Sequence, residues 1–267
     1  MKKRIAFIGC GNLASIICQQ IGLTLPDDYE VCAVYGPHFD FTEQFAQRFH
    51  IAHAPSIAAL LDLNPDYVVE ADSPATCAAV MPEIVKAGVP MIVLSTGAFA
   101  QPGLLDQVQC LSRQSGSQVY LASGAIGALD LMQAASLMGP VETTVINRKP
   151  PHSLEGAPAL GGRAPSQTEA EQVFSGSARE AIQAFPQNVN VAVTAALMTA
   201  GLDDTRVEII SDPAMVFNSH QIELKGRFGR AMVTIDSAPS PQNPKSSELA
   251  AWSVLALLKR LSGPLTF

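Results

Sequence analysis

The first half of the chain alternates short apolar runs with longer stretches whose apolar residues recur at helical spacing. The apolar runs predict buried strands, and the stretches between them predict crossover helices. The predicted strands span 4–8, 29–35, 67–70, 91–94 and 118–122, and the predicted helices span 12–21, 41–49, 57–61, 76–87 and 104–115. This alternation predicts an α/β domain over residues 1–123, built on a doubly wound parallel sheet.

The pattern changes after residue 123 to longer strands and isolated helices. Alternating positions predict strands over 141–148, 207–211 and 230–235, and the apolar stretch 189–202 predicts a buried helix. The Pro- and Gly-rich segment 150–168 predicts a surface loop. We therefore expect a second domain of the α+β class over 124–245. Residues 246–267 are expected to form a helix that packs back on the first domain.

Composition narrows the function classes. The length of 267 residues favours two domains. The composition, 48% apolar and 15% charged residues, is typical of a compact folded protein. The net charge of −7 and the lack of any long basic run argue against a nucleic-acid partner. The apolar stretch 189–202 is too short to span a membrane. The five cysteines form no CxxC pair, so we expect a cytoplasmic protein without a zinc site or disulfide framework.

A glycine-rich turn joins the first predicted strand to the first helix, as Gly9-x-Gly11-x-x-Ala14. In this strand–turn–helix setting the pattern is the dinucleotide fingerprint. Gly9 allows the tight turn, Gly11 lets the backbone approach a pyrophosphate, and Ala14 permits close packing of helix on strand. Asn12 and Leu13 begin the helix whose N-terminus would bind the pyrophosphate. The sequence therefore predicts a Rossmann domain that binds NAD or NADP.

The choice between NAD and NADP depends on the end of the second strand. An NAD site usually has a carboxylate there for the ribose 2′-OH. Here the segment 35–38 has the sequence YGPH, and Asp40 is the first carboxylate. His38 is either a donor to a 2′-phosphate or an exposed loop residue. Because the usual carboxylate is missing, the sequence predicts use of both cofactors or a preference for NADP.

Two further loops follow predicted parallel strands, at 70–74 and 95–98. Loops at the carboxyl ends of parallel strands line the ligand crevice, so we expect both loops near the nicotinamide. Asp72 and Ser73 are equally good candidates for capping the helix near Thr76.

Four segments in the second half accompany the fingerprint in a characteristic order. They are FPQNVNVA at 185–192, DP at 212–213, NSHQI at 218–222 and NPKSS at 243–247. Together they resemble the L-aspartate dehydrogenase family, whose members oxidise the Cα–N bond of aspartate with NAD or NADP. The resemblance covers nearly the whole chain and implies a Rossmann domain, an α+β substrate domain and a homodimer.

The resemblance also implies roles for individual residues. Backbone near Ala125 and the amide of Asn190 would contact the cofactor, and His220 would be the catalytic acid–base. A histidine suits this role because its ordinary pKa near 6.5 lets it take and release protons around neutrality. His220 lies between two predicted strands. Family members often carry Glu after this histidine, whereas this chain has Gln221.

A dicarboxylate substrate requires cations in this acidic chain. The candidate substrate contacts are Arg148, Lys149, Lys245 and the Ser246 hydroxyl. Each cation is equally compatible with a solvated surface position, and Ser246 with a cap of the last helix. No metal site is expected.

The predicted activity is NAD(P)-dependent oxidation of L-aspartate to iminoaspartate. The product either hydrolyses to oxaloacetate and ammonia or feeds pyridine nucleotide biosynthesis. Two alternatives remain open. One is a related two-domain oxidoreductase acting on another small amino or imino acid. The other is a non-catalytic NAD(P)-binding sensor.

Overall fold

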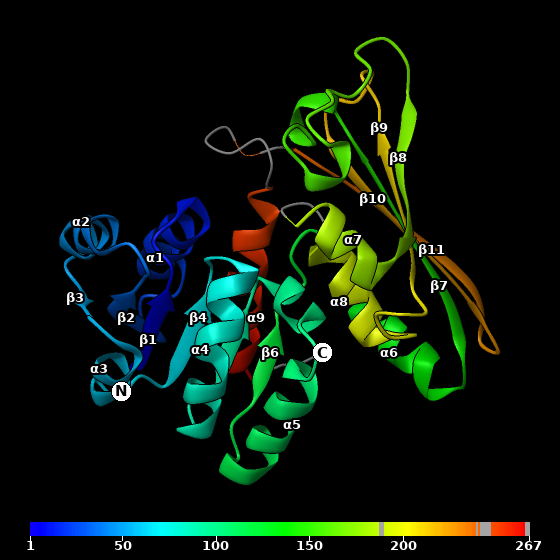
Figure 1. Cartoon of the computed structure of the whole chain (residues 1–267). Helices are drawn as coiled ribbons and strands as arrows, with labels where there is room; N and C mark the ends of the chain where they lie inside the picture. Colours follow the sequence, from blue (N-terminus) through cyan, green and yellow to red (C-terminus); the bar gives the residue numbers. More distant parts are fainter. Residues whose placement is uncertain (187–189, 239, 241–246, 265–267) are drawn as a thin grey trace. The chain divides into compact units, whose positions relative to one another are not determined.

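The computed structural model describes residues 1–186, 190–238, 240 and 247–264. Contacts between residues divide the chain into two compact units (Figure 1). Met1–Ala122 and the chain from Ala250 onward form the first unit, and Ser123–Leu249 forms the second. Each unit is built on its own sheet.

The first unit contains a parallel sheet in the order β3-β2-β1-β4-β5-β6. Its strands are β1 (Lys3–Ile8), β2 (Tyr29–Tyr35), β3 (Ala52–His53), β4 (Tyr67–Glu70), β5 (Met91–Val93) and β6 (Val119–Leu121). This is the strand order of dinucleotide-binding Rossmann domains, so the predicted fold class is confirmed. The order reverses between β1 and β4. Ligands of such sheets bind at the carboxyl ends of the strands at this point.

Helices pack on this sheet and complete its core. They are α1 (Asn12–Thr24), α2 (Phe39–Phe49), α3 (Ile57–Asp62), α4 (Pro74–Lys86), the 3₁₀ turn η1 (Thr96–Ala100), α5 (Leu104–Ser115) and α9 (Leu249–Ser262). Ile5 and Phe7 alternate along β1 and are buried with the apolar sides of α1, α2 and α9. The Tyr29 hydroxyl donates to the Leu258 carbonyl at 2.8 Å, which ties α9 to β2.

The second unit contains a mixed sheet in the order β11-β10-β7-β9-β8. Its strands are β7 (Val141–Lys149), β8 (Glu171–Ser177), β9 (Arg206–Ser211), β10 (Asn218–Gly226) and β11 (Gly229–Ser237), and its helices are α6 (Leu129–Leu137), α7 (Ala178–Ala184) and α8 (Asn190–Met198). α8 packs on β7, and α7 packs on β8 and β9 (Figure 1). The predicted α+β class is confirmed.

One local prediction is wrong. His220 was expected between strands, yet it lies inside β10. Polar residues occupy the buried positions at the start of this strand, which hides its alternation. Most of the segment 150–168 is exposed, as expected of a surface loop; it contains two 3₁₀ turns, η2 (Pro151–Ser153) and η3 (Pro158–Leu160), and Leu154 between them is fully buried. The buried apolar residues of this segment are Leu154, Ala157 and Leu160.

None of the helices described in the structure is long and apolar enough to cross a membrane.

Candidate active site

The glycine turn after β1 is fixed by close contact with the loop that follows β4. Gly9 has a φ of 99°, and its N–H donates to the Tyr35 carbonyl at 2.8 Å. A Cβ at Gly9 would lie 2.8 Å from the Ala71 carbonyl oxygen and 2.8 Å from Asp72 Cβ. Contacts that short do not occur, so only glycine fits this position.

Gly11 differs from Gly9 because the space beside it is open. A Cβ built on Gly11 would meet no atom within 4 Å. Gly11 is the N-cap of α1 and provides no side chain to cap it, while Ala14 is fully buried against the sheet. An open approach to a helix N-terminus fits the pyrophosphate of a dinucleotide. Asn12 and Leu13 form the first turn of α1.

A buried carboxylate at the end of β4 joins the two loops that were expected near the nicotinamide. Glu70 is 0% exposed, and its Oε1 and Oε2 accept the N–H groups of Asp72 and Ser95, each at 2.9 Å. Burial raises its pKa above the ordinary range. Ser73 caps α4 by accepting the Thr76 N–H at 3.2 Å. The sequence placed Glu70 in the predicted loop 70–74 but gave it no role of its own.

The end of β2 carries no carboxylate. His38 is exposed, occupies the N-cap position of α2, and its carbonyl accepts the Thr42 hydroxyl at 2.8 Å. Asp40 lies in the first turn of that helix and is also exposed.

His220 is buried in the second unit and is bonded to Asn147 across the strands. It is 4% exposed, and it lies directly opposite Asn147 in the antiparallel pair of β10 and β7. The ring Nδ1–H donates to the Asn147 Oδ1 at 2.6 Å, because an amide oxygen has no proton to give. Nε2 therefore carries the lone pair. Burial, and then the charge of Lys149, lowers the pKa of His220 to about 3.

Lys149 lies two residues beyond Asn147 on the same buried face of β7. It is 3% exposed, and burial lowers its pKa to about 8. Its partner across the sheet is Ser211, the last residue of β9. The first residue of β10, Asn218, is buried two positions before His220. Three neighbouring strands thus place polar side chains at one end of a buried face.

We call this group the polar cluster: Asn147, Lys149, Ser211, Asn218 and His220. Within the described part of the chain, Asn147 Nδ2, Ser211 Oγ and Asn218 Oδ1 are buried with no hydrogen-bond partner. Buried polar atoms are nearly always bonded, because leaving them unsatisfied is costly. Such a concentration at one end of a sheet is typical of a site that a polar ligand completes.

Arg148 and Gln221 lie on the opposite face of the sheet from the polar cluster. Arg148 lies on the opposite face of β7, where its guanidinium donates to Asp212 Oδ2 at 2.9 Å. Gln221 is also on the opposite face of β10 from His220, and its amide donates to Glu223 at 2.6 Å. The residue after His220 therefore does not contact the imidazole, and Asn147 does.

The remaining predicted residues lie on other elements or outside the described residues. Asn190 begins α8, and its carbonyl accepts the Thr194 hydroxyl at 3.0 Å. Ala125 is buried in a turn that follows Gly124, whose φ is 63°. Lys245 and Ser246 lie outside the described residues.

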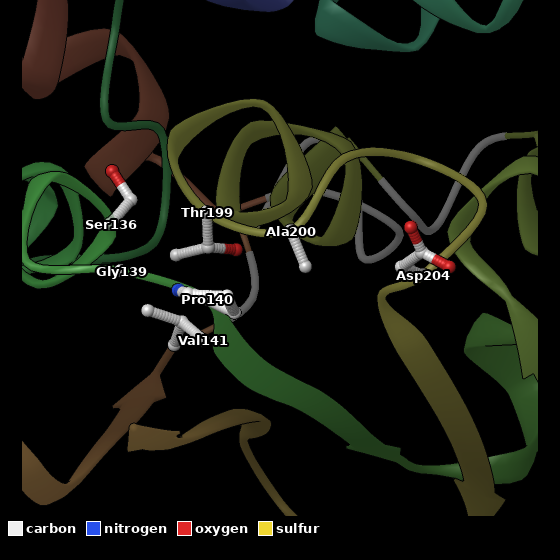
Figure 2. A pocket seen from close by; sticks show the side chains of 7 residues that line it. All are labelled: Ser136, Gly139, Pro140, Val141, Thr199, Ala200 and Asp204. Carbon is white, nitrogen blue, oxygen red and sulfur yellow. The ribbon is translucent and has the colours of Figure 1, made fainter. Parts of the chain in front are cut away.

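A cavity of about 410 Å³ opens near the first residue of β7, at the opposite end of that strand from Lys149 (Figure 2). Its lining residues are Ser136, Gly139, Pro140, Val141, Thr199, Ala200 and Asp204. The only charge in this lining is a carboxylate, so the cavity does not suit a dicarboxylate. None of the predicted site residues lines it.

Among the residues that the structure describes, no group of three or more His, Cys, Asp or Glu side chains could hold a metal ion.

Two family models match the two halves of the chain. The model described as "Homoserine dehydrogenase, NAD binding domain" matches residues 9–122. The model described as "Aspartate dehydrogenase, C-terminal" matches residues 130–261.

Curated relatives match almost end to end. L-aspartate dehydrogenase of Methanosarcina acetivorans is 34% identical over 98% of this chain and 97% of its own length. L-aspartate dehydrogenase 2 of Bordetella bronchiseptica is 34% identical over 97% of each chain. Each match therefore spans both halves of the chain.

Solved structures show the same fold. The crystal structure of aspartate dehydrogenase from Thermotoga maritima has a TM-score of 0.77 at 26% identity, covering 100% of both chains. Dihydrodipicolinate reductase from Paenisporosarcina sp. has a TM-score of 0.56 at 16% identity, covering 98% of this chain and 95% of its own. The second likeness concerns the fold alone.

Proposed function

Because the chain belongs to the L-aspartate dehydrogenase family, we propose that it catalyses the NAD(P)-dependent oxidation of L-aspartate to iminoaspartate. The observation that carries this proposal is the polar cluster. The cluster holds His220 near the buried Lys149, and three of its buried polar atoms have no hydrogen-bond partner within the described chain. A small dianion with an amino group satisfies these groups together.

The nucleotide turn provides the cofactor site. Gly9, Gly11, Asn12 and Leu13 would hold the pyrophosphate, and Asn190 and backbone near Ala125 would contact the nicotinamide half. The open approach over Gly11 supports this role, because a larger residue would fill it. The bound cofactor supplies the hydride acceptor for the aspartate Cα.

Lys149 is the proposed anchor for a substrate carboxylate. A buried ammonium attracts a carboxylate strongly, because solvent does not screen the pair. Lys245 and Ser246 are proposed to assist. Arg148 is ion-paired with Asp212 on the other face of the sheet, so we give it no part in binding.

His220 is the proposed acid–base. In the free protein its low pKa keeps the imidazole neutral at pH 7, with the Nε2 lone pair available. A dicarboxylate bound at Lys149 would offset the ammonium charge, which is the smaller cause of the lowered pKa of His220, while burial, the larger cause, remains. The imidazole then takes the ammonium proton of aspartate as hydride leaves Cα, and later activates water against the imine.

We also propose a cofactor range, an oligomeric state and a fate for the product. Both NAD and NADP are accepted, since the end of β2 has no carboxylate to repel a 2′-phosphate. The protein acts as a cytoplasmic homodimer, and its iminoaspartate either hydrolyses to oxaloacetate and ammonia or enters pyridine nucleotide biosynthesis.

The test is absorbance at 340 nm with purified protein and L-aspartate, separately with NAD and with NADP, and in reverse with oxaloacetate and ammonia. We expect reduced cofactor to form with aspartate. Cofactor binding without turnover in either direction would refute the aspartate assignment. It would favour a different small substrate or a sensor.

A further inference from the structure

The hydrogen bond between His220 and Asn147 determines which ring nitrogen can act as a base. The two side chains lie directly opposite each other on β10 and β7, and both are at least 96% buried. No solvent competes for the bond. Because Asn147 Oδ1 accepts at 2.6 Å, the proton is held on Nδ1 and the lone pair is held on Nε2.

The nitrogen of the Asn147 amide makes no hydrogen bond within the described chain. This atom, Nδ2, is also buried. With Oδ1 turned to the imidazole, the two N–H donors of Nδ2 must point away from the ring. An N–H pair that stays buried and unbonded indicates that a ligand accepts from it.

The position of Lys149 indicates the chemistry of that ligand. Asn147 and Lys149 are two residues apart on one face of β7, so their Cα atoms are separated by about 7 Å. An amide N–H donor and an ammonium at that spacing suit an anion with several acceptor atoms. A carboxylate with two oxygens can bridge them.

We propose that Asn147 has two functions in the reaction. Its oxygen holds His220 in the Nδ1–H tautomer, which makes Asn147 a positioning residue. Its nitrogen donates to the substrate carboxylate that Lys149 binds. This inference rests on the proposed function, but its first half concerns the free protein alone.

The experiment compares Asn147→Leu and Asn147→Asp with a matched control, Gln221→Leu. Leucine removes both the acceptor and the donor. Aspartate keeps an acceptor for Nδ1–H, removes the donor and adds a negative charge. Gln221→Leu makes the same amide-to-apolar change one residue from His220, on the opposite face of the sheet.

The first readout is the ¹⁵N spectrum of the histidine side chains, with His220 assigned from the spectrum of His220→Gln. We expect the Nδ1–H tautomer in the wild-type protein, in Asn147→Asp and in the control. In Asn147→Leu we expect this preference to be lost. A purely structural role for Asn147 would not move the tautomer.

The second readout is binding and turnover. For Asn147→Leu we expect kcat to fall roughly 100-fold, because the base presents the wrong nitrogen. The inhibition constant of succinate, a dicarboxylate without an amine, should rise about tenfold for the loss of one charge-assisted hydrogen bond. In Asn147→Asp succinate binding should weaken further, while the added carboxylate shifts the acid limb of the kcat profile to higher pH. The NADH dissociation constant should not change.

The inference is overturned if His220 keeps its tautomer in Asn147→Leu, or if succinate binds both variants as it binds the wild type. If Asn147→Leu does not fold, the succinate and pH measurements on Asn147→Asp decide the matter. A wild-type protein without aspartate turnover would refute the proposed function instead. The tautomer result would still stand in that case.

Discussion

Replacing Lys149 with Met should make the protein more stable and stop it from binding dicarboxylates. Methionine is unbranched and flexible like the lysine stem, so it can fill the same buried space. The change removes an ammonium that is 3% exposed. The central quantity is therefore the free-energy cost of keeping that charge in the folded protein.

The lowered pKa gives the size of this cost. Burial moves the pKa of Lys149 from 10.5 to about 8. At roughly 1.4 kcal/mol per pKa unit, the charge costs on the order of 3 kcal/mol at neutral pH. In the 2.5-unit interval between these pKa values the unfolded chain binds more protons than the folded one, so folded stability rises with pH there. The cost is full below about pH 8 and disappears by about pH 10.5.

The assay is thermal unfolding of wild type and Lys149→Met at pH 7 and pH 10. At pH 7 the gain of up to about 3 kcal/mol should raise Tm by several degrees, at roughly 2–4 °C per kcal/mol for a protein of this size. At pH 10 the gain should be much smaller. The matched control is Lys225→Met, which removes an exposed lysine of β10 and should change neither value. A Lys149→Met protein that is less stable at pH 7, or a gain independent of pH, would refute the reasoning.

Further predictions concern both units. Gly9→Ala should lower Tm and prevent cofactor binding, because a Cβ there meets the Ala71 carbonyl. Gly11→Ala should keep the wild-type Tm but weaken NADH binding. Calorimetry measures Tm and fluorescence titration measures NADH binding in each variant. Glu70→Gln removes one of the two acceptors that hold the Asp72 and Ser95 N–H groups, so the NADH dissociation constant should rise several-fold at an unchanged kcat. Succinate affinity should be constant below about pH 8 and fall about tenfold per unit above it, as Lys149 loses its proton; a flat profile would contradict the role of Lys149.

The sequence predicted the first unit well because its signals are local. Apolar strands alternate with periodic helices, and the glycine turn lies between β1 and α1. The bridging role of Glu70 was not predicted because it depends on the loop after β5, which lies 25 residues away. Local patterns do not reveal that contact.

The second unit was harder to predict because its site depends on strand register. The start of β10 was hidden because Asn218 and His220 occupy buried positions where an apolar residue is expected. Ile222 and Leu224 continue the same face and are the signal that would have extended the strand back to residue 218. Asn147 lies 73 residues from His220, and only the pairing of β7 with β10 brings the two together.

Register also separates Arg148 from Lys149. The sequence offered both as substrate contacts, but neighbouring residues of a strand face opposite sides of the sheet. Lys149 lies in the polar cluster, and Arg148 is paired with Asp212.

His220→Ala separates acid–base chemistry on aspartate from cofactor binding. Turnover with aspartate and NADH affinity would be measured together, with His152→Ala, an exposed histidine of the same unit, as the control. We expect His220→Ala to lose at least about 100-fold in kcat while NADH binding stays at the wild-type value. His152→Ala should match the wild type in both measurements. If His220→Ala oxidises aspartate at the wild-type rate, His220 is not the acid–base.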